Sequence, residues 1–476
     1  MSGPRRVLVV GGGITGWSAA AALKRRVPLL DVTILPIAPS SDALADRIAA
    51  TLPSILGFHD DLGIGLEDAV LRTGSAYRLG TRFHGWSGRE DDYVHAYGPH
   101  GEAMGSAPFH LLWARAAEAG PVAPFDAFSA AAAMARAGRF VLPQGDGALA
   151  AHGFGLVLDL PRYVAMLGAF CRHVGVRVEP GALAGVERAS DGGIAGVRRD
   201  DGSTLAADLY LDCTGPAARL HGQLAAPRED WRRWLPCDRL VLAPGAAAEL
   251  PPCETVEAGT AGWRWTGAAD RGEVLAEGAP SIDGETIKLA AGASLEPWRD
   301  NVIAIGDAAV AIEPLEWSNL HLAHSAIDRV IAMLPAGIPH PLERAEYNRQ
   351  ALAEARRVRD FVLLHYVTSR REGVFWQDVA STEPPESLAH TLRLFRERGR
   401  LPYYEEETFD RDSWLAVLFG QGVRPRRIDP LAEAVPLADT LQAMDTYRTH
   451  LAQAIGHLPT PAAFLAAQSR KLHERA

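Results

Sequence analysis

A run of glycines directly after a short apolar stretch near the N-terminus constrains this chain most. Val7–Val10 suits a strand buried on both faces of a parallel sheet, and residues 17 to about 26 suit a helix. Between them lies the pattern G-x-G-x-x-G, formed by Gly11, Gly13 and Gly16. In such a unit the glycines permit a tight turn, close approach of a pyrophosphate, and close helix–strand packing. The sequence therefore predicts a dinucleotide site, and the alternative is a tight structural turn.

The next predicted strand, Asp31–Leu35, lacks the acid that normally follows it. A dinucleotide fold usually places Asp or Glu there to hold the ribose hydroxyls, but this chain continues with Pro36 and Ile37. Asp42 and Asp46 in the following loop are alternative anchors, although we expect them to be solvated loop charges. The pyrophosphate site is thus predicted without an obvious ribose anchor.

Two later stretches extend the cofactor prediction. The strand ending in Asp212-Cys213-Thr214-Gly215 resembles the DxxxxCxG element of flavoprotein monooxygenases, and the alternative is a buried strand followed by a turn. Asn301–Ala309 resembles a second FAD fingerprint, in which Asp307 would accept a hydrogen bond from a ribityl hydroxyl. Asp307 would also suit a helix N-cap. Three fingerprints in this order favour FAD over NAD.

Bulk properties exclude several other classes. The 476 residues exceed what one hydrophobic core supports, so we expect two or more lobes. A net charge of −10 argues against non-specific binding to nucleic acid or an anionic membrane, and no apolar stretch approaches membrane-spanning length. Four scattered cysteines without C-x-x-C spacing predict neither a metal site nor a redox dithiol, and they favour a cytoplasmic location.

Further segments, in order along residues 7 to about 430, resemble the flavin-dependent tryptophan halogenases. The resemblance is carried by "ATLPS" with "LGI", "SAYR…FHGW", "LPCDR", "GWRW", "EPLEWS…HL", "RDF…LHY", "FW" and "GQG", which begin at Ala50, Ser75, Leu235, Gly262, Glu313, Arg359, Phe375 and Gly420. This chain is therefore identified as a divergent member of that superfamily.

The resemblance implies a mechanism. Reduced FAD, supplied by a separate flavin reductase, reacts with oxygen and with chloride or bromide to give hypohalous acid. The acid then travels through a protein tunnel to an aromatic small-molecule substrate held away from the flavin. There a lysine positions or carries the halogen, and a glutamate polarises it or takes up the ring proton. The flavin supplies the oxidising chemistry, and the protein supplies separation and orientation.

Arg78 occupies the position of the family lysine. The chain's lysines, at Lys24, Lys288 and Lys471, are far from this segment. Lysine can lose its proton when buried and become nucleophilic, whereas arginine stays protonated and offers a planar fork of donors. Arg78 would hydrogen-bond hypohalous acid without passing halogen on. The alternative is a structural role, in which Arg78 pairs with Glu316 or with a surface acid.

Glu316 matches the family glutamate and is the second candidate catalytic residue. Its apolar neighbours predict a buried carboxyl whose pKa is raised and which suits acid–base work, and the alternative is a buried ion pair with an arginine. The family's halide loop reads Trp317-Ser318-Asn319 here, so Ser318 and Asn319 are the halide candidates. A bulky Trp317 would narrow the tunnel beside the flavin.

Two further motifs depart from the family. The W-x-W-x-I-P signature, thought to prevent direct oxygen transfer, ends as Thr266-Gly267-Ala268. The "GxGEAT" stretch of the flavin-binding strap reads 46–51 without its glycines and acid. Departures clustered at one site indicate altered or lost chemistry. The cofactor-binding residues that the fingerprints and the resemblance imply are Gly11, Gly13, Thr15, Gly16, Ala50, Gly306, Asp307 and Leu320.

The order of segments predicts an α/β protein with a Rossmann-like FAD/NAD(P)-binding fold of the flavin monooxygenase type, an added substrate lobe and a helical C-terminal region. We expect a discontinuous FAD domain from 1–75, 150–225 and 285–335, and a substrate-binding and helical domain from 76–149, 226–284 and 336–476. The C-terminal region contains helix-compatible stretches at Arg344–Tyr366 and Pro430–His457. A homodimer is expected only from its general prevalence.

Three functions fit this sequence. The first is halogenation of an indole or another aromatic substrate. The second is a pseudo-enzyme that binds a ligand or partner, with weak FAD binding or none. The third is a hydroxylase or other flavin monooxygenase that has lost the machinery for halogen transfer.

Overall fold

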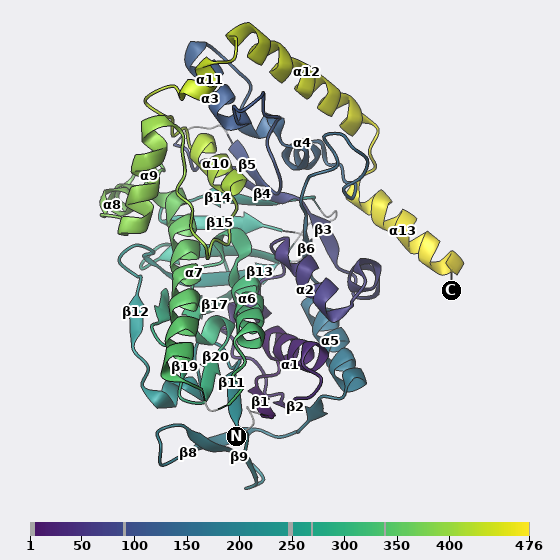
Figure 1. Ribbon diagram of the computed structural model, residues 1–476, viewed down its shortest axis with the longest axis vertical. Helices are drawn as coiled ribbons and strands as arrows, with labels where there is room; N and C mark the ends of the chain where they lie inside the picture. Colours follow the sequence, from purple (N-terminus) through teal and green to yellow (C-terminus); the bar gives the residue numbers. More distant parts are fainter. Residues whose placement is uncertain (1–4, 89–91, 246–250, 268–269, 338, 476) are drawn as a thin grey trace.

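A six-stranded sheet is built from strands between Arg6 and Ala304. The structure, a computed structural model, describes residues 5–88, 92–245, 251–267, 270–337 and 339–475 (Figure 1). The sheet has the order β19-β20-β11-β1-β2-β7, and all neighbours are parallel except β19 and β20. Its strands are β1 (Arg6–Val10), β2 (Asp31–Leu35), β7 (Arg177–Val178), β11 (Leu209–Asp212), β19 (Trp298–Arg299) and β20 (Val302–Ala304). This arrangement confirms the Rossmann-like fold class.

A second, seven-stranded sheet lies beside the first (Figure 1). Its order is β17-β13-β16-β15-β14-β4-β5, with a parallel pair only between β14 and β4. The strands are β4 (Gly80–His84), β5 (Asp92–Ala96), β13 (Cys237–Pro244), β14 (Glu254–Ala258), β15 (Gly262–Thr266), β16 (Asp270–Ala276) and β17 (Glu285–Lys288). Chain segments far apart in the sequence thus meet in this sheet.

Three small sheets complete the strand structure. A two-stranded pair joins β3 to β6, and two three-stranded sheets have the orders β10-β9-β8 and β12-β18-β21. Their bounds are β3 (Ala76–Arg78), β6 (Gly155–Val157), β8 (Leu183–Arg188), β9 (Ile194–Arg199), β10 (Thr204–Leu205), β12 (Arg228–Asp230), β18 (Gly292–Ser294) and β21 (Val310–Ala311). The pair β3–β6 matters most here because it carries Arg78.

Helices cover the sheets and form most of the C-terminal region. The α-helices are α1 (Ile14–Arg26), α2 (Ser54–Leu62), α3 (Phe109–Ala119), α4 (Ala130–Ala137), α5 (Leu160–Val174), α6 (Asn319–Ala332), α7 (Pro341–Val367), α8 (Val374–Ser381), α9 (Glu386–Arg398), α10 (Arg411–Gly420), α11 (Pro430–Glu433), α12 (Leu437–Gly456) and α13 (Pro461–Arg475). Short helical turns are η1 (Leu44–Asp46), η2 (Asp68–Arg72), η3 (Phe125–Phe128), η4 (His221–Leu224), η5 (Gly306–Ala308) and η6 (Leu315–Trp317). No helix of the described residues is long and apolar enough to cross a bilayer.

The helix-compatible stretch Pro430–His457 forms two helices instead of one continuous helix. The chain forms α11 and α12 with a break between them, because Pro436 takes the extended conformation that precedes α12. A proline disfavours the helical conformation in the residue before it, which here is Val435. The helix expected over Arg344–Tyr366 is confirmed and begins slightly earlier, where His340 and Glu343 cap α7.

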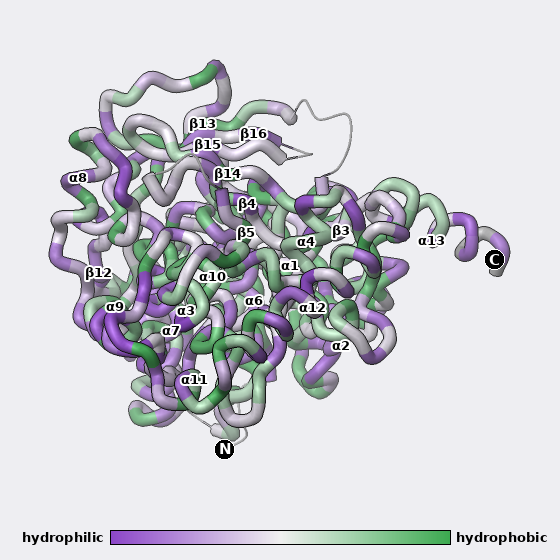
Figure 2. The backbone as a smooth tube through the Cα atoms, turned by 90° about the horizontal axis from the view of Figure 1, so that it is seen from above, coloured by the Kyte–Doolittle hydropathy of each residue, from purple (hydrophilic) through white to green (hydrophobic). Residues whose placement is uncertain are grey.

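Two large apolar clusters stabilise the molecule. One packs helices α1, α5 and α6 against the six-stranded sheet, and the other fills the space between the seven-stranded sheet and helices α3, α7 and α10. The boundaries proposed for the two domains remain a prediction. Helix α13 projects from this body (Figure 2), and its Gln468 side chain accepts a hydrogen bond from the Tyr77 hydroxyl at 2.9 Å.

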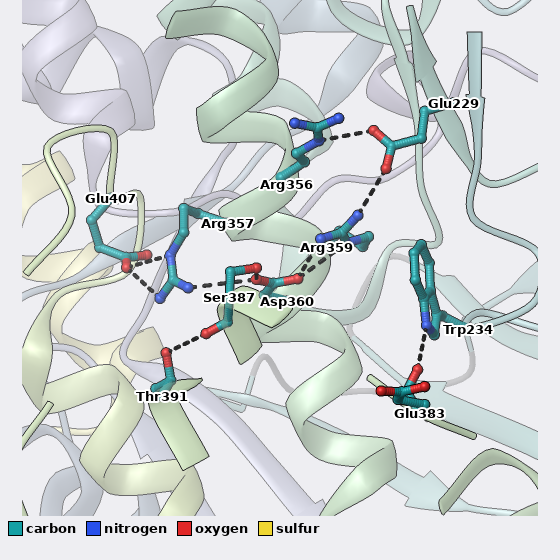
Figure 3. Close-up of polar contacts among 10 residues, drawn as sticks. All are labelled: Glu229, Trp234, Arg356, Arg357, Arg359, Asp360, Glu383, Ser387, Thr391 and Glu407. Carbon is teal, nitrogen blue, oxygen red and sulfur yellow. Dashed lines mark hydrogen bonds and ion pairs between the residues drawn. The ribbon is translucent and has the colours of Figure 1, made fainter. Parts of the chain in front are cut away.

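A buried ion network ties α7 to its neighbours (Figure 3). Asp360, which is fully buried, accepts hydrogen bonds from Arg359 at 2.8 and 3.1 Å and one from Ser387 of α9. Arg359 reaches Glu229 of β12 at 3.2 Å, and Arg357 lies 3.5 Å from Asp360. The carboxylate of Asp360 therefore compensates two buried guanidinium groups.

Replacing Asp360 by Asn is expected to lower the free energy of unfolding by about 1–3 kcal/mol, because the amide nitrogen cannot accept the buried hydrogen bond that Arg359 or Ser387 donates to a carboxylate oxygen. The measurement is urea denaturation. The control is Asp230→Asn, which breaks an exposed pair with Arg232 and should cost less than about 1 kcal/mol. Equal losses in the two variants would contradict the network's role.

Candidate functional site

The turn between β1 and α1 requires glycine at two positions. Gly11 has φ +138°, and a Cβ there would lie 2.3 Å from the Cys213 carbonyl oxygen. A Cβ at Gly16 would lie 2.0 Å from the carbonyl oxygen of Gly11. These contacts bring the N-terminus of α1 against the ends of β1 and β11. The backbone thus has the shape that a pyrophosphate-binding turn needs.

Asp46 was expected to be a solvated loop charge, and this was wrong. Its carboxylate accepts a hydrogen bond from the Ile14 backbone N–H at 2.5 Å, at the N-terminus of α1. A free N–H and the positive end of the helix dipole favour an anion at this place. Burial raises the pKa of Asp46 to about 6, although the hydrogen bond from Ile14 and the charge of Arg47 oppose the shift.

Asp307 does not act as a helix N-cap. It lies in the short turn η5, and its Oδ2 accepts a hydrogen bond from the Ala45 backbone N–H at 3.0 Å. Burial raises the pKa of Asp307 to about 7, and the nearby Asp46 charge raises it further against the hydrogen bond from Ala45. Hydrogen bonds thus tie η1 to α1 through its own Asp46 and to η5 through Asp307.

The other predicted cofactor residues lie near this turn or border it. A Cβ at Gly306 (φ +61°) would lie 3.4 Å from the Thr15 side chain, so η5 and α1 are in contact. Leu320 is buried at the start of α6. Ala50 forms a bridge with Val157 at the edge of β6. The glycine turn, Asp307 and α6 thus meet around η1.

Arg78 is fully buried and is held by a buried acid, not by Glu316 or a surface acid. The register pairs Glu254 of β14 with Thr81 of β4, which brings the Glu254 carboxylate to Arg78. Its Oε2 lies 2.7 Å from Nη2 and 2.8 Å from Nε of the guanidinium. The remaining donors reach the Thr51 and Gly80 carbonyl oxygens, the Thr81 hydroxyl and the Tyr97 hydroxyl. All five N–H groups of Arg78 are therefore used inside the protein.

Glu316 lies on a backbone turn that is unusual for non-glycine residues. Glu316 has φ +68° and Trp317 has φ +60°, both in the left-handed region. Its carboxylate is fully buried, with Oε2 2.8 Å from Nδ1 of His95 and Oε1 3.0 Å from Nε2 of His365. The second contact is close without being well directed as a hydrogen bond. The turn thus presents one carboxylate to two imidazoles.

The expected rise in the pKa of Glu316 was wrong. Burial does raise it, but the charges and hydrogen bonds of His95 and His365 outweigh burial and lower the pKa of Glu316 to about 2. Sequence reasoning missed both histidines as partners. The alternation of β5 places Tyr93 and His95 on one face, and that was the available signal. The Tyr93 hydroxyl lies 3.0 Å from Nδ1 of His365 and so extends the cluster.

The two signature tryptophans are engaged in the interior. The Trp263 indole donates to Glu313 at 3.0 Å, and the Tyr366 hydroxyl donates to the same carboxylate at 2.6 Å. Burial raises the pKa of Glu313 to about 7. Trp265 is buried too, and Ala268 at the end of the signature lies outside the described residues.

The predicted halide residues stand at the start of α6. The Ser318 hydroxyl is fully buried and has no hydrogen-bond partner within the described ranges, and Asn319 donates to the Ile312 carbonyl oxygen at 3.1 Å. Trp317 is buried and donates to the Thr81 hydroxyl at 2.9 Å. The structure thus connects Trp317 to the Arg78 cluster through Thr81.

A cavity of about 800 Å³, partly open to solvent, is lined by residues of α3, η3 and α10 and by Tyr93. Aromatic side chains and one ion cluster form much of its wall, including Tyr93, Trp113, Phe125, Phe419, Asp126 and Arg136. Pockets of this volume receive drug-sized molecules. Among the residues with described positions, no group of three His, Cys, Asp or Glu side chains is arranged to hold a metal ion.

Comparisons with known proteins point to one family. The family model described as tryptophan halogenase matches residues 6–270 and 267–437. The tryptophan 6-halogenase SttH of Streptomyces toxytricini is 26% identical over 496 residues, covering 92% of this chain and 93% of that protein.

Solved structures agree in fold. BrvH, a flavin-dependent halogenase from Brevundimonas sp. BAL3, is 31% identical with a TM-score of 0.91, covering 98% of this chain and 99% of that chain. A flavin-dependent halogenase from Xanthomonas campestris is 30% identical, also with a TM-score of 0.91, covering 98% of each chain. The similarity therefore extends over nearly the whole polypeptide.

Proposed function

Because this chain belongs to the tryptophan halogenase family, we propose that it is an FAD-dependent enzyme that halogenates an indole or another aromatic substrate with oxygen and chloride or bromide. The observation that carries this proposal is Glu316, a fully buried carboxylate held between His95 and His365 on a left-handed turn. Strained backbone of this kind gathers at functional sites. A separate flavin reductase would supply the reduced cofactor, and we propose a cytoplasmic location.

In this proposal the cofactor, the start of α6, Glu316 and its two histidine partners have separate roles. Reduced FAD, when bound, would activate oxygen, which is the oxidant that converts halide into an electrophile. The α6 N-terminus with Ser318 and Asn319 holds the halide, because helix N-termini stabilise anions. Glu316 stabilises the positive charge that develops on the aromatic ring during substitution and accepts the ring proton. His95 and His365 keep its carboxylate oriented and ionised.

The low pKa of Glu316 decides which task suits it. A carboxyl with a pKa of about 2 is ionised throughout the neutral range, so it cannot serve as a general acid there. It serves as an electrostatic stabiliser in a site with little water, where charges interact strongly. This assignment keeps the proton-accepting role that the sequence predicted for Glu316 and excludes the general-acid role.

The test uses purified protein with reduced FAD, oxygen, bromide and indole or tryptophan, followed by mass spectrometry. A product with the bromine isotope pattern supports the proposal. A product with one added oxygen atom favours a monooxygenase. Failure to bind FAD in either redox state would contradict both enzyme functions and leave the ligand-binding pseudo-enzyme.

The monooxygenase alternative has an observation of its own. Arg78 replaces the halogen-carrying lysine and has no donor left, because Glu254, Tyr97, Thr81 and two carbonyl oxygens use them all. The signature that is thought to prevent direct oxygen transfer also loses its Ile-Pro end. Both features favour oxygen transfer over halogen transfer.

Arg78→Lys alone is expected to raise halogenated product by less than about tenfold, equivalent to 1.4 kcal/mol of barrier. A lysine here would still face Glu254, which would hold the amine protonated and away from the reaction. The measurement is brominated indole per enzyme under the conditions above, with unchanged protein as the reference. Full activity in the Arg78→Lys variant would show that the rest of the site is already competent.

A further inference from the structure

The three-residue turn η1 forms hydrogen bonds with two groups that FAD would otherwise bind. Ala45 of η1 donates its backbone N–H to Asp307 at 3.0 Å, and Asp46 accepts the Ile14 N–H at 2.5 Å. Ile14 is the first residue of α1, so its N–H points out of the helix without an intrahelical partner. The turn thus occupies both the anion-binding end of α1 and the acid predicted to hold the ribityl chain.

The Asp46 carboxylate also fills the space that Gly13 leaves. A Cβ at Gly13 would lie 2.2 Å from Oδ2 and 2.3 Å from Oδ1 of Asp46. In a dinucleotide-binding turn this glycine is the one that lets the pyrophosphate approach the backbone. A carboxylate and a phosphate are both anions that accept hydrogen bonds from helix N-termini. Asp46 therefore takes the position of a cofactor phosphate in charge, in bonding and in space.

We propose that Asp46 is the residue that sets flavin affinity in this chain, by competing with the cofactor pyrophosphate for the N-terminus of α1. The inference rests on the proposed use of FAD. Before the phosphate can bind, η1 has to move out of the turn, and the hydrogen bonds from Ile14 to Asp46 and from Ala45 to Asp307 have to break. Asp46 thereby weakens the binding of the cofactor.

The electrostatic surroundings make this competition sensitive to pH. The groups facing Asp46 are the Ile14 N–H on α1, Arg47 on its own segment, Asp307 on η5 and the Cys213 thiol after β11. Arg47 is shared, because it also pairs with Glu285. The pyrophosphate of FAD stays ionised between pH 5 and 8. As the pH falls through about 6, Asp46 takes up a proton and stops repelling the phosphate, so flavin should bind more tightly.

The experiment compares Asp46→Asn with the unchanged full-length protein, using flavin fluorescence and titration calorimetry. Asp46→Asn removes the charge that strengthens the hydrogen bond from the Ile14 N–H, so the phosphate competes with a weaker acceptor. The Kd for FAD and for ADP should therefore fall about tenfold in this variant. Riboflavin, which has no phosphate, should bind equally to both proteins. The matched control is Asp68→Asn on η2, which removes the same charge from a pair with Arg72 and should leave every Kd unchanged.

A pH series supplies the second readout. The Kd of the unchanged protein for FAD should fall as the pH falls from about 7.5 to about 5.5, and Asp46→Asn should flatten that slope. Asp307 has a pKa raised to about 7, titrates in the same range and is present in both proteins, so only the difference between them reports on Asp46.

Three outcomes would overturn the inference. Equal FAD affinity in both proteins would show that Asp46 does not compete. Weaker FAD binding in Asp46→Asn would make Asp46 a flavin ligand. An equal gain for riboflavin would show that phosphate is not the group displaced. If neither protein binds FAD, ADP or riboflavin, the proposed function fails together with the inference, whereas the three outcomes above leave FAD binding intact.

Discussion

Glu254→Ala is expected to lower the free energy of unfolding by about 3–5 kcal/mol, because it leaves the Arg78 guanidinium buried without a compensating charge. Arg78 is 0% exposed and Glu254 is 5% exposed, so the guanidinium cannot turn into bulk solvent when the carboxylate is lost. The polar partners of Arg78 remain, but none of them carries a full negative charge. The measurement is urea denaturation with the slope and midpoint both reported.

A second glutamate on the same strand provides the control. Glu257 also lies on β14, but it pairs with Arg264 on the surface, so Glu257→Ala should cost less than about 1 kcal/mol. If Glu254→Ala does not accumulate as folded protein, Glu254→Gln provides a milder loss of the same charge. The double variant Arg78→Met with Glu254→Leu should recover part of the loss, because it removes both charges. Equal costs for the Glu254 and Glu257 variants would contradict the assignment.

Glu316→Gln is expected to reduce the rate of aromatic halogenation by about 10² or more, the range typical for removal of a proton-transfer group. The amide keeps the size of the side chain but cannot stabilise positive charge on the ring or accept its proton. The measurement is turnover under bromide with indole, with FAD affinity determined in parallel. An undiminished rate would remove Glu316 from the proposed site.

Stability against pH gives this variant a second readout that does not depend on catalysis. The folded pKa of Glu316 is lowered from 4.5 to about 2, so ionisation stabilises the fold above the unfolded pKa. The stability difference between unchanged protein and Glu316→Gln should therefore be full above about pH 4.5 and disappear as the pH falls toward 2.

Glu313→Gln is the matched comparison, three residues earlier on the same segment. The folded pKa of Glu313 is raised to about 7, so its protonated form is the one the fold favours. Its contribution is present below about pH 4.5 and is lost as the pH rises toward 7. The two glutamine variants should thus differ in the sign of their pH dependence. Parallel profiles would contradict the opposite environments of Glu313 and Glu316.

The strand–turn–helix unit was predictable because it depends on local rules. The strand Asp31–Leu35 occurs with the expected bounds, and Gly11 is required by its φ angle and by its approach to Cys213. An apolar run or an obligatory glycine depends only on the few residues around it in the sequence.

The partners of the charged residues were not predictable in the same way. Arg78 and Glu254 are 176 residues apart, and only the register between β14 and β4 brings them together. Glu316 meets His95 from a strand 221 residues earlier and His365 from a helix that follows it. A single sequence contains no signal for such long-range pairs. The direction of the pKa shift of Glu316 depends on those pairs, which is why burial alone gave the wrong sign.

Glu316 and Trp317 both take left-handed backbone conformations. Each costs about 1–2 kcal/mol relative to an ordinary helical conformation. The packing around η6 must hold the turn against this cost, as is typical of functional sites. The carboxylate of Glu316 is therefore fixed in its position before any ligand binds.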